Sequence, residues 1–217
     1  MSSKRVIYLH GFASSPASRK AQFFAEKLSR EGFTVETPDL AAGDFEHLTL
    51  SGQLQILEQL LESGPATLFG SSMGGYLAAL AAARYPNQIQ KLVLLAPAFG
   101  FYDLWTQELG PERLAAWRKN GTIPIFHYGE GREAPLAFRL MEDAAQFEAF
   151  PEIRQPGLLF HGVNDPLVPI EQSRRYAASH PNIRLLEFRS GHELTDVLAD
   201  MWQAAREFLL DGHVQIL

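Results

Sequence analysis

The sequence predicts an α/β protein built on a mainly parallel sheet of about six strands, with helices on both faces. Two observations support this fold class. Short apolar runs alternate with amphipathic segments along most of the chain, and a Gly-x-Ser-x-Gly sequence centred on Ser72 joins one such run to a helical segment. Strands and helices that alternate at short intervals are typical of parallel strands joined by right-handed crossovers.

The composition is that of a single folded domain. The chain has 217 residues, of which 46% are hydrophobic and 20% are charged, and its net charge is −6. The negative charge, with no basic cluster against it, argues against nucleic acid or an anionic membrane as a partner. Disulfides and thiolate metal sites are excluded because the chain has no cysteine, and no run approaches the roughly 20 apolar residues that span a bilayer. We therefore expect a soluble, cytoplasmic protein with one domain over residues 1–217.

The first half of the chain is predicted to form four strands separated by three helices. The predicted strands are Arg5 to His10, Phe33 to Thr37, Thr67 to Phe69 and Lys91 to Leu95. The predicted helices are one that Ser18 caps and Gly32 ends, one marked by Leu50, Leu54, Leu57 and Leu61, and one from Met73 to Ala83. A glycine or proline follows shortly after each segment, as expected where regular structure stops.

The segment from Phe99 to Gln155 interrupts this alternation. It has no apolar run of the strand type, and its two short helical patterns run from Pro111 to Lys119 and from Pro135 to Phe147. Aromatic residues are dense in the segment: Phe99, Phe101, Tyr102, Trp105, Trp117, Phe126, Tyr128, Phe138, Phe147 and Phe150. Long insertions in compact domains often serve as lids or binding walls, so we expect a small helical lid here. Most of its aromatic residues would fill its own core, and a minority would line a pocket.

The alternation resumes after this insertion. The predicted elements are a strand from Gly157 to His161, a helix from Pro169 to Ser179 and a strand from Arg184 to Phe188. A last helix is expected after Gly191, because apolar residues recur at helical spacing from Leu194 to Leu209.

The Gly-x-Ser-x-Gly sequence makes Ser72 the candidate nucleophile. Gly70 and Gly74 lie two residues before and after Ser72, whereas the same spacing fails for Ser71. Glycines avoid clashes in such a strand-to-helix turn. The amide groups at the helix start then point at the serine oxygen, where negative charge develops during acyl transfer. The structural alternative is a tight turn whose serine caps the helix. A phosphate-binding loop is excluded because no Gly-Lys-Ser/Thr follows.

Residue types suited to nucleophilic catalysis follow several predicted strands. A serine hydroxyl needs a base to accept its proton, and the base needs a partner that fixes its tautomer. In a parallel sheet, sites form at the carboxyl ends of the strands. The residues at these ends are His10, Asp39, Ser72, His161, Asp165 and His192. Taken singly, Asp165 could be a turn former before Pro166, and His192 could be a helix-start residue.

The order Ser72, Asp165, His192 is that of the α/β-hydrolase triad. With His10-Gly11-Phe12 placed like the oxyanion loop, the whole chain resembles the α/β-hydrolase superfamily, and most of all its small bacterial serine esterases. The superfamily's two leading antiparallel strands are absent, which implies a reduced sheet.

The resemblance also assigns roles. It makes Ser72 the nucleophile, His192 the general base and Asp165 the orienting carboxylate, with Asp103 as a rival acid in the insertion. The backbone N–H groups of Phe12 and Met73 would form the oxyanion hole.

These residues lead us to expect a serine hydrolase that cleaves a small soluble carboxylic ester or thioester through an acyl-enzyme, without a cofactor. Phe12, Phe99, Phe101 and Trp105 are the candidates for contacts with the substrate. The charged residues of the insertion argue against the broad apolar surface of an interfacial lipase. Two alternatives stay open: a carbon–carbon bond or lactone hydrolase with the same triad, and a non-catalytic domain that binds a ligand in the same cleft.

The remaining histidines have structural interpretations. His10 and His161 are expected to brace their loops by hydrogen bonds, and the histidines expected to face solvent are His47, His127, His180 and His213. A metal site formed by His10, His161, Asp165 and His192 is the alternative, because their loops converge. It would compete for the base that Ser72 needs, so we expect no metal.

Overall fold

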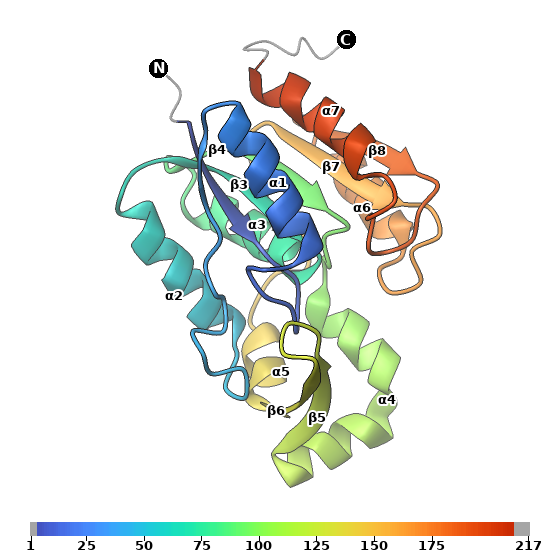
Figure 1. Cartoon of the computed structure of the whole chain (residues 1–217). Coiled ribbons are helices and arrows are strands. Elements are labelled where there is room, and N and C mark those ends of the chain that lie inside the picture. The colour runs from blue at the N-terminus through green and yellow to red at the C-terminus, as the bar shows by residue number, and fades with distance from the viewer. Residues whose placement is uncertain (1–3, 211–217) are drawn as a thin grey trace.

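The computed structural model describes residues 4–210 (Figure 1). The strands are β1 (Arg5–Leu9), β2 (Thr34–Glu36), β3 (Ala66–Ser71), β4 (Ile89–Leu95), β5 (Thr122–His127), β6 (Arg132–Ala137), β7 (Gly157–Gly162) and β8 (Ile183–Phe188). The helices are α1 (Arg19–Arg30), α2 (Leu50–Leu61), α3 (Met73–Arg84), α4 (Phe101–Asn120), α5 (Arg139–Ala144), α6 (Ile170–Ser179) and α7 (Leu198–Leu210). Every strand and helix predicted outside the insertion is present, with its ends shifted by a few residues.

The main sheet has six strands in the order β2-β1-β3-β4-β7-β8, and every neighbouring pair is parallel. This confirms the reduced parallel sheet expected from the sequence. Strand β3, which leads to Ser72, lies inside the sheet between β1 and β4. The carboxyl ends of these strands therefore bring the residues after β1, β3, β7 and β8 to one edge.

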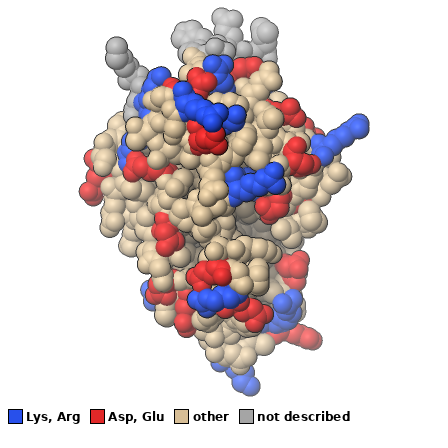
Figure 2. All heavy atoms as spheres, viewed as in Figure 1, with Lys and Arg blue, Asp and Glu red and all other residues tan. Residues whose placement is uncertain are grey.

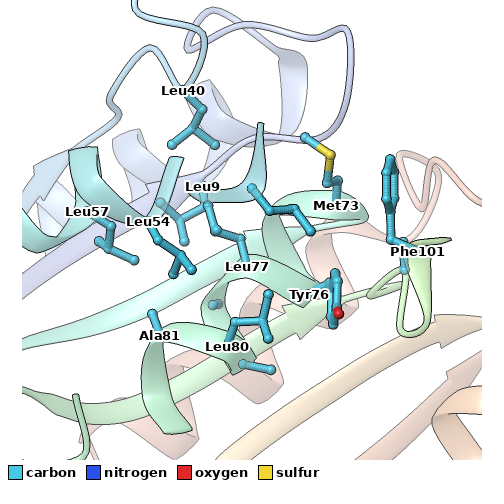
Figure 3. Close-up of a cluster of buried hydrophobic side chains, with 14 of the residues drawn as sticks. Leu9, Leu40, Leu54, Leu57, Met73, Tyr76, Leu77, Leu80, Ala81 and Phe101 are labelled. Carbon is cyan, nitrogen blue, oxygen red and sulfur yellow. The ribbon is translucent and has the colours of Figure 1, made fainter. Parts of the chain in front are cut away.

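Alternating side chains of each strand enter two different cores. In β1, Val6 and Tyr8 pack with α1 and α7, whereas Ile7 and Leu9 pack with α2 and α3. Figure 1 shows α1 and α7 together on one face of the sheet. On the other face, Figure 3 shows Leu54 of α2 beside Leu77 of α3. Burial on both faces explains why the strands read as continuous apolar runs rather than alternating ones.

Side-chain caps start the first two helices, and the one at Ser18 was predicted from the sequence. The Ser18 hydroxyl accepts a hydrogen bond from Ala21 N–H at 3.3 Å, and the Thr49 hydroxyl accepts one from Gly52 N–H at 3.0 Å. Each cap satisfies one of the amide groups that a helix start leaves without an intrahelical acceptor.

The last helix begins later than predicted. Residues 191–197 form turns, and α7 starts at Leu198. Leu194 has a positive φ of 54°, which the helix cannot include. The helical spacing of the apolar residues is misleading here. Leu194 lies before the helix, yet its side chain is buried in the same hydrophobic cluster as those of α7.

The insertion is only partly helical. Strands β5 and β6 pair as an antiparallel hairpin, so the helix predicted from Pro135 to Phe147 is wrong in its first part and reduces to the short α5. The buried residues of β6, Ala134 and Leu136, alternate with exposed ones, as in a half-buried strand. Helix α4 is longer than predicted but is kinked at Gly110, which has φ 70° and ψ 168°.

The insertion has an aromatic core of its own and also contacts the main sheet's loops. Trp117 is fully buried, its ring meets those of Trp105 and Phe138, and its Nε1–H donates to the Leu136 carbonyl at 2.9 Å. At the hairpin tip, Tyr128 N–H donates to the carbonyl of Ala13 at 2.8 Å. The hairpin is therefore tied to the loop that follows β1.

The described residues contain no helix that is both long and apolar enough to cross a membrane. On the face shown in Figure 2, lysine and arginine are interspersed with aspartate and glutamate. This face has no large patch of one charge sign that would attract a polyanion.

We expect Gly74→Ala to destabilise the fold by about 1–3 kcal/mol, the usual cost of overpacking a filled interior. A Cβ at Gly74 would lie 2.3 Å from the Leu9 carbonyl oxygen and 2.4 Å from that of His10, and backbone atoms cannot move aside. Urea unfolding would measure the change. The control is Gly11→Ala, whose Cβ would meet its nearest neighbour at 3.4 Å. Equal stability of the two variants would contradict this close packing.

Candidate active site

Ser72 lies on a strained turn between β3 and α3. Its backbone has φ 54° and ψ −118°, a conformation that non-glycine residues rarely adopt. Two hydrogen bonds hold that backbone to the end of β4, from Ser72 N–H to the Leu95 carbonyl at 2.8 Å and from Ala98 N–H to the Ser72 carbonyl at 3.0 Å. Ser72 is partly exposed, whereas Ser71 is buried within β3. Of the two serines, Ser72 is therefore the one that a ligand can reach.

Side chains from three strand ends meet at Ser72. His192 Nε2 lies 3.0 Å from Ser72 Oγ, and His192 Nδ1 lies 2.7 Å from Asp165 Oδ2. An ionised carboxylate can only accept hydrogen bonds, so Nδ1 carries the ring proton and Nε2 is left as an acceptor for the serine hydroxyl. The three residues that the sequence singled out are thus hydrogen-bonded in series.

Asp165 is held by donors on both of its oxygens. Oδ1 accepts hydrogen bonds from the N–H groups of Leu167 and Val168, both at 2.9 Å. Oδ2 faces His192 and also lies 3.2 Å from His161 Nε2. Burial by itself would raise the pKa of Asp165, but the hydrogen bonds from His161, His192 and Val168 outweigh it and hold that pKa below its usual value. Asp165 is therefore ionised near neutral pH.

Two backbone amides beside Ser72 have no acceptor among residues 4–210. They are the N–H groups of Phe12 and Met73, the residues predicted for an oxyanion hole. Met73 is the first residue of α3, so its amide stands at the positive end of the helix dipole. A Cβ placed on Gly11 would lie 3.5 Å from Ser72 Cβ, which shows how closely the loop after β1 approaches the serine. Both amides are thus available to an anionic oxygen near Ser72.

Aromatic rings from the insertion extend the site beyond Phe12. Phe12 meets Trp105 edge-on at a centroid distance of 5.0 Å and Phe101 at 6.3 Å. Trp105 also lines a cavity of about 380 Å³ between α4 and β5, whose lining includes the apolar Leu109 and Ile125 and the charged Glu108 and Arg113. Phe101 is only 2% exposed, so Phe12 and Trp105 are the members of this cluster that keep surface for a substrate.

The fourth predicted contact residue, Phe99, lies elsewhere. It is fully buried and stacks on the ring of Tyr176 at a centroid distance of 4.1 Å. The ring of Phe150 also contacts it, at a centroid distance of 5.8 Å. No surface of Phe99 is left for a substrate. Its position directly after the β4 loop could not reveal this, because the partner rings come from distant parts of the chain.

The rival acid Asp103 does not join the site. It lies in the first turn of α4 with an exposed side chain, while Asp165 holds His192. Among the bracing histidines, His10 behaves as predicted. Its Nε2 accepts from Leu40 N–H at 3.2 Å, and its Nδ1 lies 2.9 Å from the Gly11 carbonyl.

Two of the histidines expected in solvent are buried, so that prediction is wrong for them. His127 packs edge-on against Phe45 at 4.6 Å and accepts a hydrogen bond from Glu130 N–H. His180 stacks on Tyr176 at 4.0 Å. The ring against His127 comes from far away in the sequence, whereas Tyr176 lies on α6 four residues before His180. His47 is exposed as predicted, and His213 lies outside the described residues.

Lys20 is a charged residue near the site that the sequence analysis did not single out. Its side chain is largely buried, with 8% exposed, and its Nζ lies 3.5 Å from Glu193 Oε2. Glu193 is the residue that follows His192 in the chain. Burial lowers the pKa of Lys20, against the opposing charges of Glu193 and Asp165. The sequence carried one signal of this placement, because a lysine in the first turn of a helix opposes the helix dipole.

No group of three or more His, Cys, Asp or Glu side chains within residues 4–210 is arranged to hold a metal ion. His161, Asp165 and His192 do converge, but their contacts are hydrogen bonds to one another.

A family model described as Uncharacterised protein family (UPF0227) matches residues 5–209. The chain belongs to this family. The match spans the whole arrangement described above, from β1 to α7, including Ser72, Asp165 and His192. Membership in UPF0227 therefore covers both the sheet and the insertion.

Two curated proteins are similar to parts of this UPF0227 chain. Monoacylglycerol lipase abhd6-B of Xenopus laevis is 27% identical over 69% of this chain and 42% of that protein. Serine hydrolase BPHL of Mus musculus is 30% identical over 52% of this chain and 43% of that protein. The matches thus span less than half the length of these relatives.

One solved structure makes the assignment of the fold direct. Alpha/beta hydrolase domain-containing protein 10 from mouse superimposes with a TM-score of 0.80 and 19% identity, covering 94% of this chain and 89% of that one. The fold is the α/β-hydrolase fold.

The lowered pKa of Asp165 predicts how stability depends on pH. Its usual pKa is 3.8, so on acidification the unfolded chain binds a proton at Asp165 before the folded one does. The stabilisation is complete above about pH 5 and is lost as pH falls through the folded-state pKa. We therefore expect the free energy of unfolding to depend less steeply on pH in Asp165→Asn than in the unmodified chain, over about pH 3–4.5.

Denaturant titrations at a series of pH values would measure this slope. Asp103→Asn is the matched control, because it removes an exposed carboxylate and should keep the steeper slope. If the slope of Asp165→Asn equalled that of the unmodified chain, the hydrogen bonds described here would not lower the pKa of Asp165.

Proposed function

We propose that this chain is a serine hydrolase, a carboxylesterase or thioesterase that cleaves a small soluble ester or thioester through an acyl-enzyme. The observation that carries the proposal is the hydrogen-bonded series from Ser72 through His192 to Asp165, with both His192 nitrogens engaged at 3.0 and 2.7 Å. A domain that only bound a ligand would need no base aligned on an exposed serine. The names of the two relatives, a lipase and a serine hydrolase, support the same reaction class.

Acylation would begin with the proton of Ser72. His192 Nε2 accepts it as Oγ attacks the carbonyl carbon of the substrate, and the ionised Asp165 stabilises the resulting imidazolium. The tetrahedral intermediate then collapses, and His192 returns the proton to the departing alcohol or thiol. The carbonyl carbon is left bonded to Ser72 as an acyl-enzyme.

Deacylation would repeat these steps with water. His192 Nε2 takes a proton from a water molecule, the hydroxide attacks the acyl carbon, and the proton passes to Ser72 Oγ as the acid leaves. Negative charge develops on the carbonyl oxygen in both halves of the reaction. The acceptor-free N–H groups of Phe12 and Met73 are placed to donate to that oxygen, and each such donor is commonly worth a factor of about 10²–10³ in turnover.

The insertion supports a short or medium acyl chain. The partly exposed rings of Phe12 and Trp105 offer an apolar wall next to the loop after β1, which closely approaches Ser72. Burying each methylene of the substrate there would contribute about 0.8 kcal/mol. The large apolar side chains that the described part of the insertion exposes are Tyr102, Phe126 and Tyr128, too few for the broad surface of an interfacial lipase.

Replacing the nucleophile tests the proposal. Ser72→Ala should abolish labelling by a fluorophosphonate probe and lower turnover of p-nitrophenyl butyrate by about 1,000-fold or more, because no other group can form the acyl-enzyme. Ser71→Ala is the matched control, since Ser71 is buried within β3 and should keep most activity. If labelling persisted in Ser72→Ala and vanished in Ser71→Ala, the nucleophile would be Ser71 and the proposed assignment would be wrong.

Chain-length profiling tests the proposed substrate class. Among p-nitrophenyl esters from acetate to palmitate, we expect kcat/KM to peak at short or medium chains and to show no jump when the substrate forms micelles. Trp105→Ala should flatten this dependence because it removes part of the wall, whereas Phe126→Ala, on the exposed face of the hairpin, should leave it unchanged. A maximum at palmitate with activation by micelles would indicate a lipase.

A further inference from the structure

His161 makes contacts that bracing a loop does not require. It lies near the end of β7, is fully buried, and uses both ring nitrogens. Its Nδ1 lies 2.7 Å from the hydroxyl of Ser173 on α6, and its Nε2 lies 2.9 Å from the Val168 carbonyl. The same Nε2 is 3.2 Å from Asp165 Oδ2, the oxygen that receives His192. The ring thus touches the carboxylate at the atom that orients the base.

The hydrogen-bond partners determine the tautomer of His161. A backbone carbonyl can only accept, so Nε2 carries a hydrogen, and in the tautomer with hydrogen on Nε2 alone, Nδ1 accepts a hydrogen bond from the Ser173 hydroxyl. With its hydrogen on Nε2, His161 donates to the Val168 carbonyl at 2.9 Å and shares the same N–H with Asp165 Oδ2, which lies 3.2 Å from Nε2. Ser173 is itself fully buried, and the hydroxyl has no other partner in the described part of the chain.

The consequence for Asp165 is a carboxylate with every acceptor position in use. Two backbone N–H groups occupy Oδ1, and the rings of His161 and His192 share Oδ2. A carboxylate offers about four acceptor positions. Rotation of the group about its terminal bond would break all four contacts, so Oδ2 stays directed at His192.

The geometry points to His161 as a positioning residue that holds Asp165 Oδ2 on His192 Nδ1. This inference rests on the proposed serine hydrolase. In it, Ser173, His161, Asp165, His192 and Ser72 form one continuous hydrogen-bonded series from α6 to the nucleophile. A loosened Asp165 would stabilise the His192 imidazolium less in the transition state. Loss of His161 should therefore lower kcat and leave KM nearly unchanged.

No charged side chain other than Asp165 among the described residues is a hydrogen-bond partner of the His161 ring. Besides Asp165, the charged group that faces His161 is Glu187, its register partner on the neighbouring strand β8. Glu187 is already paired with Arg174 at 2.7 Å. The polar contacts of the His161 ring are therefore with Ser173, Val168 and Asp165.

A pair of amide substitutions separates the two ends of the ring. The side-chain amide of Gln reaches the position of Nε2, so His161→Gln can still donate to Asp165, while the shorter amide of His161→Asn reaches only the position of Nδ1. We expect His161→Gln to keep most of kcat. His161→Asn should lose about 10- to 100-fold, the range typical for removal of an outer hydrogen-bond partner. His180→Asn is the matched control, because it alters another buried histidine of this region that does not contact Asp165.

A spectroscopic measurement distinguishes positioning from a general loss of packing. The proton on His192 Nδ1 that bonds Asp165 should give a downfield ¹H NMR resonance in the unmodified chain, His161→Gln and His180→Asn, and this resonance should move or disappear in His161→Asn. Wild-type kcat and an unchanged resonance in His161→Asn would overturn the inference. If His161→Asn does not fold, Ser173→Ala replaces it, with a lowered kcat expected and a wild-type kcat overturning the inference.

Failure of this inference and failure of the proposed function are distinguishable. If Ser72→Ala leaves turnover and probe labelling intact, the serine hydrolase proposal fails, whatever the His161 variants do. If Ser72→Ala is inactive while His161→Asn matches His180→Asn, only the positioning role of His161 is overturned.

Discussion

The β3–α3 turn packs directly against the end of β1. The backbone of Gly74 packs against the carbonyls of Leu9 and His10, and that of Gly70 against Gly74 itself, with no room for a side chain at either position. This contact lets α3 start directly at the serine and brings the loop after β1 beside it. Ser72 is held in an unfavourable backbone conformation because the sheet on both sides determines its position.

Burial of Asp165 and His161 explains the dense hydrogen bonding at the end of the site away from Ser72. Asp165 and His161 have fully buried side chains, so every polar atom there needs a partner, and each partner restricts the geometry of the next. Its hydrogen-bond donors hold the pKa of Asp165 below the usual value, although burial alone would raise that pKa. The result is an acceptor for His192 whose direction is set by backbone amides and by a second histidine rather than by solvent.

Much of the fold was accessible from the sequence because local signals and burial agree. The strands of the main sheet are short apolar runs, the first helices carry side-chain caps, and Ser72, Asp165 and His192 each follow a strand. Prediction failed where a local pattern has two interpretations. The residues from Pro135 onward can be arranged with either helical or strand spacing, and pairing of β6 with β5 decides for the strand. Likewise, Leu194 matches the period of α7 but lies in the turn that carries His192.

Residue types at short spacings were enough to predict the parallel sheet, the turn at Ser72 and the chain order of the three hydrogen-bonded residues. Which side chains share an environment depends on how the elements pack together. That packing removed Phe99 from the site by stacking it on Tyr176, buried His127 and His180 behind aromatic rings, and placed His161 on the same oxygen as His192. The partners of Phe99 and His127 lie far away in the chain. Where the partners are four residues apart, as in Tyr176–His180 and His161–Asp165, the spacing alone does not show which atoms meet.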